Sequence, residues 1–150
     1  MAEVTEIREP NFGVDLPGQW EQAQSDEVGT LVFRQVEGPA SLTVVLLGVR
    51  PMFAIADQKR LLEDYMSHRS RFEEGRSPTL VHGDTLARQS GDAFEGYWIG
   101  EDPAHERLVR HRVLLVDGLL ADFAYEAQGV EARAFAAEAD AVLASATASV

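Results

Sequence analysis

Hydrophobic and polar residues alternate along most of this chain, a pattern typical of β-strands with one buried face. The first such run, Asn11–Gly18, ends at a Pro-Gly turn. Two further runs, Thr30–Val36 and Ser41–Val49, are rich in β-branched and large apolar residues. A Glu-Gly-Pro break separates them, so they predict a β-hairpin.

The period of the pattern changes after Pro51. Apolar residues then recur every three to four positions between charged ones, which predicts an amphipathic helix over Ile55–Glu74. Gly75 and Pro78 are typical residues for ending such a helix. A helix is therefore expected after the first three strands.

Strand patterns resume after Pro78, with turn residues at Ser90-Gly91-Asp92 and an Asp-Gly pair at 117–118. In the last of these runs, apolar residues alternate with Asp122 and Glu126. We therefore expect one face of the sheet to be covered and the other to be at least partly wet. The four predicted strands are Thr79–Arg88, Ala93–Gly100, Arg107–Val116 and Leu119–Glu126.

The end of the chain is rich in alanine, with nine alanines between Glu131 and Ala148. This composition predicts a closing helix that lies close to the sheet. The fold class is then α+β: a single antiparallel β-sheet, in the order β-β-β-α-β-β-β-β-α, covered by two helices. We predict one domain over residues 1–150, with a flexible tail at about 145–150.

Composition narrows the function classes. The chain has 150 residues, a length that suits one domain. It contains no cysteine, so thiolate catalysis, zinc–thiolate sites and iron–sulfur clusters are excluded. Its formal net charge of −12 disfavours nucleic-acid binding, because that binding depends on Lys and Arg neutralising phosphates. An acidic N-terminus without a long apolar run predicts a cytoplasmic protein with no membrane span.

Motifs for catalysis are missing from the linear sequence. There is no Gly-x-Ser-x-Gly elbow, and Gly91, Gly96 and Gly100 lie along a predicted strand rather than at a strand-to-helix junction. We therefore assign no catalytic residue, cofactor or metal and predict a protein that is not an enzyme. A site assembled in space from distant residues stays a third alternative. No metal-binding spacing connects the four histidines, His68, His82, His105 and His111.

Two arginines stand out on this acidic chain. Arg110 and Arg112 share one side of the strand Arg107–Val116, where guanidinium groups could bind an anion or an acidic partner. The alternative is cross-strand pairing with acids such as Asp122 or Glu95. Both readings stay open at this stage.

An aromatic pair lies on the adjoining predicted strand. Tyr97 and Trp98 point to opposite faces of the sheet, so one is expected in the core and the other at the surface. An exposed aromatic beside the arginines would mark a contact surface. The candidate binding residues are therefore Trp98, Arg110 and Arg112.

The opening motif Phe12-x-Val14-x-Leu16-Pro17-x-x-Trp20, with the element order given above, resembles the PsbP-like superfamily, including its bacterial DcrB-like branch. The resemblance implies a sheet flanked by helices without a common active site. Its members include photosystem extrinsic subunits, a nuclear-transport Ran-binding protein, mycobacterial lipoproteins, and chaperone adaptors for type VI secretion effectors. Because no signal peptide or lipidation cysteine is seen, cytosolic adaptors are the nearer analogues.

We therefore expect a non-catalytic protein-binding adaptor or a chaperone-like domain with a protein partner. The alternative is a carrier of small hydrophobic ligands, with a pocket between sheet and helix lined by residues such as Phe53, Tyr65, Trp98 and Phe123. An edge strand in an incompletely closed sheet also makes a homodimer an open alternative.

Overall fold

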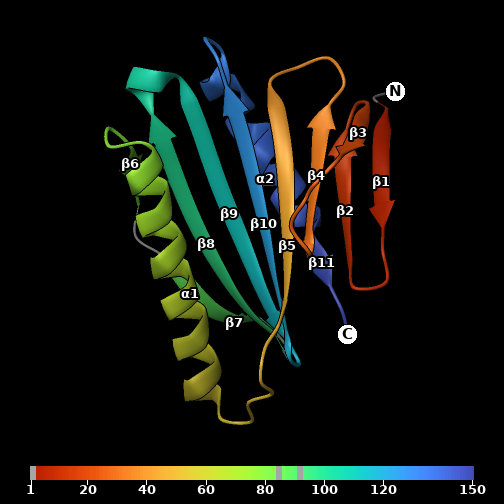
Figure 1. Cartoon of the computed structure of the whole chain (residues 1–150), viewed down its shortest axis with the longest axis vertical. Helices are drawn as coiled ribbons and strands as arrows, with labels where there is room; N and C mark the ends of the chain where they lie inside the picture. The colour runs from red at the N-terminus through yellow and green to blue at the C-terminus, as the bar shows by residue number, and fades with distance from the viewer. Residues whose placement is uncertain (1–2, 84–85, 91–92) are drawn as a thin grey trace.

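The computed structural model describes residues 3–83, 86–90 and 93–150. Within these residues the larger sheet runs in the order β3-β4-β5-β10-β9-β8-β6, and β7 also pairs with β8 (Figure 1). Every strand pair in it is antiparallel. Its strands are β3 (Trp20–Ala23), β4 (Thr30–Gln35), β5 (Ala40–Gly48), β6 (Val81–His82), β7 (Leu86–Ser90), β8 (Ala93–Asp102), β9 (Arg107–Val116) and β10 (Leu119–Gln128).

A smaller sheet and a helix cover one face of the larger sheet. The smaller sheet has the order β1-β2-β11, with β1 at Val4–Arg8, β2 at Phe12–Pro17 and β11 at Thr147–Ala148. The helix α2 (Ala136–Ser145) follows a short 3-10 turn, η2 (Ala132–Phe135), and packs against β2, β9 and β10. A second 3-10 turn, η1 (Pro103–His105), joins β8 to β9.

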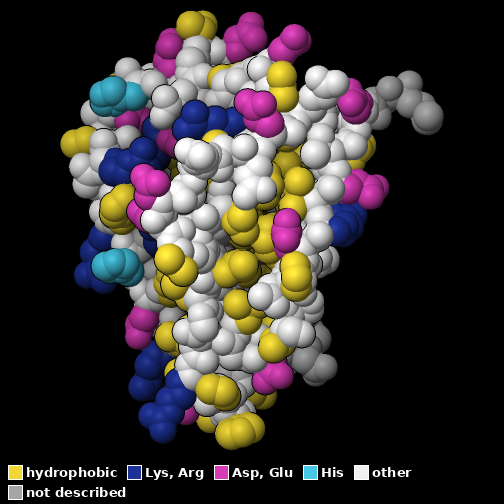
Figure 2. Space-filling model, turned by 45° about the vertical axis from the view of Figure 1, so that its right-hand side comes forward, with side chains coloured by type: hydrophobic (Ala, Val, Ile, Leu, Met, Phe, Trp, Pro, Cys, Tyr) yellow, Lys and Arg dark blue, Asp and Glu magenta, His cyan; other side chains and the backbone are white. Residues whose placement is uncertain are grey.

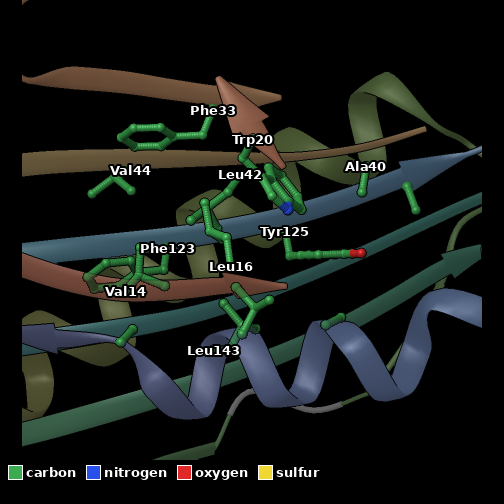
Figure 3. Packing of buried hydrophobic residues seen from close by; sticks show 14 of the residues in the cluster. Val14, Leu16, Trp20, Phe33, Ala40, Leu42, Val44, Phe123, Tyr125 and Leu143 are labelled. Atoms are coloured by element: carbon green, nitrogen blue, oxygen red, sulfur yellow. The ribbon is translucent and has the colours of Figure 1, made fainter. Parts of the chain in front are cut away.

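The other face carries the long helix α1 (Ile55–Arg76), which lies mainly against β7, β8 and β9. In Figure 1 this helix lies in front of the sheet, and α2 lies behind it. Side chains on the two faces of the larger sheet therefore form two separate cores. The larger one, between the two sheets and α2, includes Val14, Leu16, Trp20, Phe33, Leu42, Phe123, Tyr125 and Leu143 (Figure 3). The smaller one, under α1, includes Leu62, Met66, Phe94, Trp98, Val113 and Leu120.

Most predicted elements are confirmed. The predicted strand Arg107–Val116 matches β9, and the predicted hairpin of 30–49 forms as β4 and β5. The predicted helix begins at Ile55 as expected and continues two residues further, to Arg76. The α+β class with an antiparallel sheet and two helices is therefore confirmed.

The prediction of a single sheet was incomplete. The segment Val4–Arg8 forms β1, which was not predicted because its side chains are exposed or half-buried and its polar residues hide the alternation. It pairs with β2 as part of the smaller sheet. The chain then turns at Gly18, whose φ of 85° favours glycine, and enters the larger sheet as β3.

The end of the chain also differs from the prediction. The closing helix is shorter, and Thr147 and Ala148 pair with β2 as β11 instead of extending as a free tail. The backbone N–H of Ser149 donates to the carbonyl of Asn11 at 2.9 Å. The predicted strand 79–88 forms as β6 and β7; its residues 84–85 and the predicted turn residues 91–92 lie outside the described residues.

Candidate functional site

Arg112 ties α2 to the larger sheet. Its Nη1 donates to the carbonyl oxygens of Leu143 at 2.7 Å and Ala146 at 2.9 Å, where the helix ends. Its Nη2 donates to the Glu95 carboxylate at 2.7 Å. The cross-strand pairing considered as the alternative is thus present for Glu95, and a cation at the C-terminal end of a helix is electrostatically favourable.

Arg110, two residues before Arg112, makes a similar connection to α2. It lies on the same side of β9, donates to the carbonyl of Ala136 at 3.1 Å and forms an ion pair with Asp140. The predicted sharing of one strand face by Arg110 and Arg112 is confirmed. In this arrangement both guanidinium groups bind α2.

Replacing Arg112 by methionine should lower the free energy of unfolding by about 2 kcal/mol, because Glu95 and the last carbonyls of α2 then lose a charged donor. Urea denaturation measures this change, and amide hydrogen exchange should quicken in α2. Arg71, exposed on α1, offers a matched control whose methionine variant should change stability by less than about 0.5 kcal/mol. Equal effects of the two variants would contradict this role for Arg112.

Trp98 lies on the opposite face of the sheet from the two arginines. It is 2% exposed, belongs to the core under α1, and its indole N–H donates to Ser70 Oγ at 3.0 Å. The structure therefore does not bring Trp98 together with Arg110 and Arg112. The aromatic beside Arg112 is half-buried Tyr97, whose ring centroid lies 5.9 Å from the guanidinium carbon.

A buried polar cluster lies between α1 and the strands β9 and β10. At its centre the Asp122 carboxylate, fully buried, accepts a hydrogen bond from the Tyr65 hydroxyl at 2.6 Å. His111 Nδ1 lies 2.9 Å from the same carboxylate, and Arg69 Nε lies 3.4 Å from it. Asp122 was predicted on a partly wet face; that was wrong, because Tyr65 and Arg69 of α1 cover it.

The cluster continues toward the end of α1. Glu73 Oε1 lies 3.7 Å from His111 Nε2, and Arg107 donates to the same carboxylate at 2.5 Å. Arg107 also donates to Ser77 Oγ at 2.9 Å and pairs with Glu126. With His111 protonated, three cations face three carboxylates. We call this set the buried network: Tyr65, Arg69, Glu73, Ser77, Arg107, His111, Asp122 and Glu126.

Proton affinities in the buried network follow from these contacts. Burial disfavours the charged imidazolium, but the Asp122 carboxylate outweighs burial and raises the pKa of His111 to about 9. Burial likewise opposes ionisation of Glu73, yet the nearby charge of His111 and the hydrogen bond from Arg107 lower its pKa to about 2. Burial and the charge of Asp122 raise the pKa of the Tyr65 hydroxyl. At neutral pH His111 and Glu73 are therefore charged, and the Tyr65 hydroxyl is neutral.

Because His111 is 1% exposed and Asp122 is fully buried, a substrate could not reach this Tyr-Asp-His arrangement without displacing α1. What the contacts do is fasten α1 to the sheet. Sequence reasoning missed the network, although one signal was present: Tyr65, Arg69 and Glu73 are spaced by four residues and so share one side of a helix.

The three histidines other than His111 lie at the surface. His68 is exposed on α1, His82 lies beside Glu74, and His105 Nδ1 lies 2.7 Å from the buried carboxylate of Asp102. Across residues 3–83, 86–90 and 93–150, no three His, Asp or Glu side chains are placed to hold a metal ion together.

Part of the larger sheet is left uncovered on the α1 side. The strand registers place Val45 opposite Asp122, Leu47 opposite Leu120, and Val32 opposite Thr43, so these side chains share the face on which α1 lies. Val32, Thr43 and Val45 are half-buried and Leu47 is 40% exposed, whereas Asp122 and Leu120 are buried. We call this surface the open face: Val32, Thr43, Val45, Leu47 and Ala124.

Figure 2 looks partly onto this side of the molecule and shows hydrophobic side chains gathered in the middle of the view. Lys and Arg side chains lie mostly to one side of them, while acidic side chains are scattered around the rest of the border. The expectation of a partly wet sheet face therefore holds for β4, β5 and part of β10, but not under α1.

A pocket of about 390 Å³ lies at the end of the sheet where β5 leads into α1 and β9 turns into β10. The sequence placed Phe53, Tyr65, Trp98 and Phe123 around one pocket, and the structure separates them. Phe53 is 96% exposed, while Phe123 and Trp98 belong to the two different cores. The pocket is lined by Val49, Arg50, Met52, Gln58, Leu61, Leu115, Val116, Asp117 and Gly118.

Comparisons with known proteins bear on the fold. No protein-family model and no curated protein matches the chain. Cyanobacterial PsbP (CyanoP) from Synechocystis has a similar solution structure, with a TM-score of 0.74 at 14% identity over 99% of this chain and 94% of that one. The chain has a PsbP-like fold.

Two further PsbP-like structures extend the comparison. The Ran-binding protein Mog1p from Saccharomyces cerevisiae aligns with a TM-score of 0.59 at 10% identity over 99% of this chain and 96% of that one. LpqN of Mycobacterium tuberculosis, involved in cell envelope biogenesis, gives 0.56 at 14% identity over 99% and 92%. Neither helix in the described part of the chain is long and apolar enough to cross a membrane.

Proposed function

We propose that this PsbP-like domain is a non-catalytic adaptor or chaperone-like protein that binds another protein through its open face. The observation that carries the proposal is the apolar surface of β4, β5 and β10, which α1 leaves uncovered. Contiguous apolar surface rimmed by polar residues is typical of protein-binding sites. The PsbP-like Mog1p, a Ran-binding protein, shows that this fold can serve protein binding.

The charge distribution indicates the chemistry of the partner. The helix α1 carries five basic and five acidic residues, so the net charge of −12 comes from the rest of the chain. A partner with an apolar surface, bordered on part of its edge by Lys and Arg, would complement the open face and the acidic side chains along the border away from α1. Its association rate should fall as ionic strength rises.

Membership of the bacterial DcrB-like branch and a cytoplasmic location are part of the proposal. Both rest on the resemblance of the opening motif Phe12-x-Val14-x-Leu16-Pro17-x-x-Trp20 to that superfamily. A heterologous partner is preferred over a homodimer, because two copies, each with a net charge of −12, would repel each other.

A photo-crosslinking amino acid placed at position 45 tests the proposal. In cells, we expect it to capture one heterologous protein that the same label at Val130, an exposed position after β10, does not capture. The purified partner should then bind wild-type protein, while Val45→Asp should weaken the affinity at least about tenfold, because the interface would bury an unpaired charge.

Val130→Asp introduces the same charge at a site that is 85% exposed and should leave the affinity unchanged. Circular dichroism establishes that both variants are folded. The proposal fails if the captured protein binds Val45→Asp as tightly as wild type. It also fails if position 45 crosslinks nothing, or crosslinks a second copy of this chain alone.

A further inference from the structure

We infer that the 390 Å³ pocket receives one apolar side chain of the partner, either aromatic or branched aliphatic, as an anchor. This inference rests on the proposed function, because it concerns the partner that would cover the open face. Protein interfaces commonly concentrate their binding energy in a few apolar side chains that fill pockets.

Two hydrogen bonds hold parts of the pocket lining in place. The backbone N–H of Val49 donates to the carbonyl of Gly118 at 2.8 Å, which fixes the end of β5 to the turn between β9 and β10. The Gln58 side-chain amide donates to the carbonyl of Met52 at 2.9 Å, which fixes the loop before α1 to the first turns of that helix. The walls are therefore formed without the partner.

The lining combines hydrophobic side chains with polar groups. Val49, Met52, Leu61 and Leu115 supply hydrophobic side chains, while Arg50, Gln58 and Asp117 supply the polar part of the lining. The lining charges of Arg50 and Asp117 oppose each other, so the pocket has no strong preference for a charged occupant. Its volume lies near the lower end of the roughly 300–1,000 Å³ usual for ligand pockets.

Apolar surface next to the pocket argues for a protein side chain as the occupant. Leu47 of the open face lies two residues before Val49 on the same side of the chain, so the pocket continues the open face. Phe53, next to the lining residue Met52, is 96% exposed, and Ile55 at the start of α1 is also exposed. A small ligand confined to the pocket would leave these side chains in water, whereas a protein partner would cover them.

The first test uses anchor mimics and the full chain. N-acetyl-tryptophanamide and N-acetyl-leucinamide should cause saturable NMR shifts of the Val49, Leu61 and Gly118 amides, and N-acetyl-glycinamide should not. Leu61→Trp fills the pocket and should abolish these shifts. Met52→Trp, in the loop outside the sheet, gives a second filling variant if Leu61→Trp does not fold.

The control for the added indole is Val130→Trp, at a position remote from the pocket lining, which should bind both mimics as wild type does. The inference is overturned if neither mimic shifts these amides. It is also overturned if the shifts persist in a folded filling variant.

The second test separates this inference from the proposed function. With the partner captured at position 45, Leu61→Trp should weaken binding at least about tenfold, as Val45→Asp does. If Val45→Asp weakens binding and Leu61→Trp does not, the anchor inference fails alone. If neither weakens it, the proposed function fails. Native mass spectrometry that finds a small molecule retained by wild type and lost from Leu61→Trp would identify a free ligand as the occupant and overturn the inference.

Discussion

Replacing Asp122 by alanine should lower the free energy of unfolding by about 3–5 kcal/mol, the largest effect we expect from one substitution. The carboxylate is fully buried and faces His111, Arg69 and the hydroxyl of Tyr65. Its removal leaves His111, which is 1% exposed, and the partly exposed Arg69 without their nearest counter-charge. That cost exceeds the loss of a single hydrogen bond.

Urea denaturation followed by circular dichroism measures the change. Asp64, an exposed acid on α1, provides the matched control, and Asp64→Ala should change stability by less than about 0.5 kcal/mol. The double variant Asp122→Ala with His111→Leu should recover part of the loss, because the unpaired imidazolium is then absent. A cost for Asp122→Ala as small as the control's would show that the buried network does not hold α1.

The buried network links stability to the proposed binding surface. Tyr65 and Arg69 meet Asp122 at the border of the open face, since Asp122 pairs with Val45 across β10 and β5. A fastened α1 therefore keeps one wall of that surface in place. Loosening α1 by Asp122→Ala should also disturb the pocket, whose lining includes Leu61 of the same helix.

The fold was largely predictable because hydrophobic alternation reports burial directly. The strand Arg107–Val116 was predicted at its observed ends, since its apolar residues lie on both faces and both faces are covered. The strand Val4–Arg8 was missed because it lies at the edge of the smaller sheet and buries little. Patterns of hydrophobicity carry little information about such edge strands.

The candidate sites were less predictable, because the position of α1 determines which side chains on one sheet face are buried and which are exposed. The alternation of polar and apolar residues correctly places Asp122 and Phe123 on opposite faces of the sheet. It does not show whether a helix covers the face that carries Asp122. The same helix covers Trp98 and leaves Val45 open. Candidate residues chosen from one strand at a time, such as Arg110 and Arg112, proved to contact α2, which lies more than twenty residues further along the chain.

The free energy of unfolding should be highest between about pH 5 and 6.5 and should fall at both lower and higher pH. The fall at higher pH tests the role of His111. Its pKa is about 9 when folded, against an ordinary value of 6.5, so its contribution is fully present below about pH 6.5 and is lost as pH rises through 9. That contribution is about 3 kcal/mol. On the acidic side, Glu73 has a folded pKa of about 2, so its contribution is present above its ordinary pKa of 4.5 and is lost as pH falls toward 2.

Urea denaturation of wild type and His111→Gln between pH 6 and 9.5 measures the alkaline part. Wild type should lose most of the 3 kcal/mol over this range, whereas His111→Gln should be less stable at pH 6 and nearly independent of pH. The range stops below pH 10 because Tyr65, whose pKa is also raised by folding, would then add its own loss of stability. Parallel pH profiles for the two proteins would show that His111 does not carry the extra proton in the folded state. The buried network would then not place three positive charges against three carboxylates.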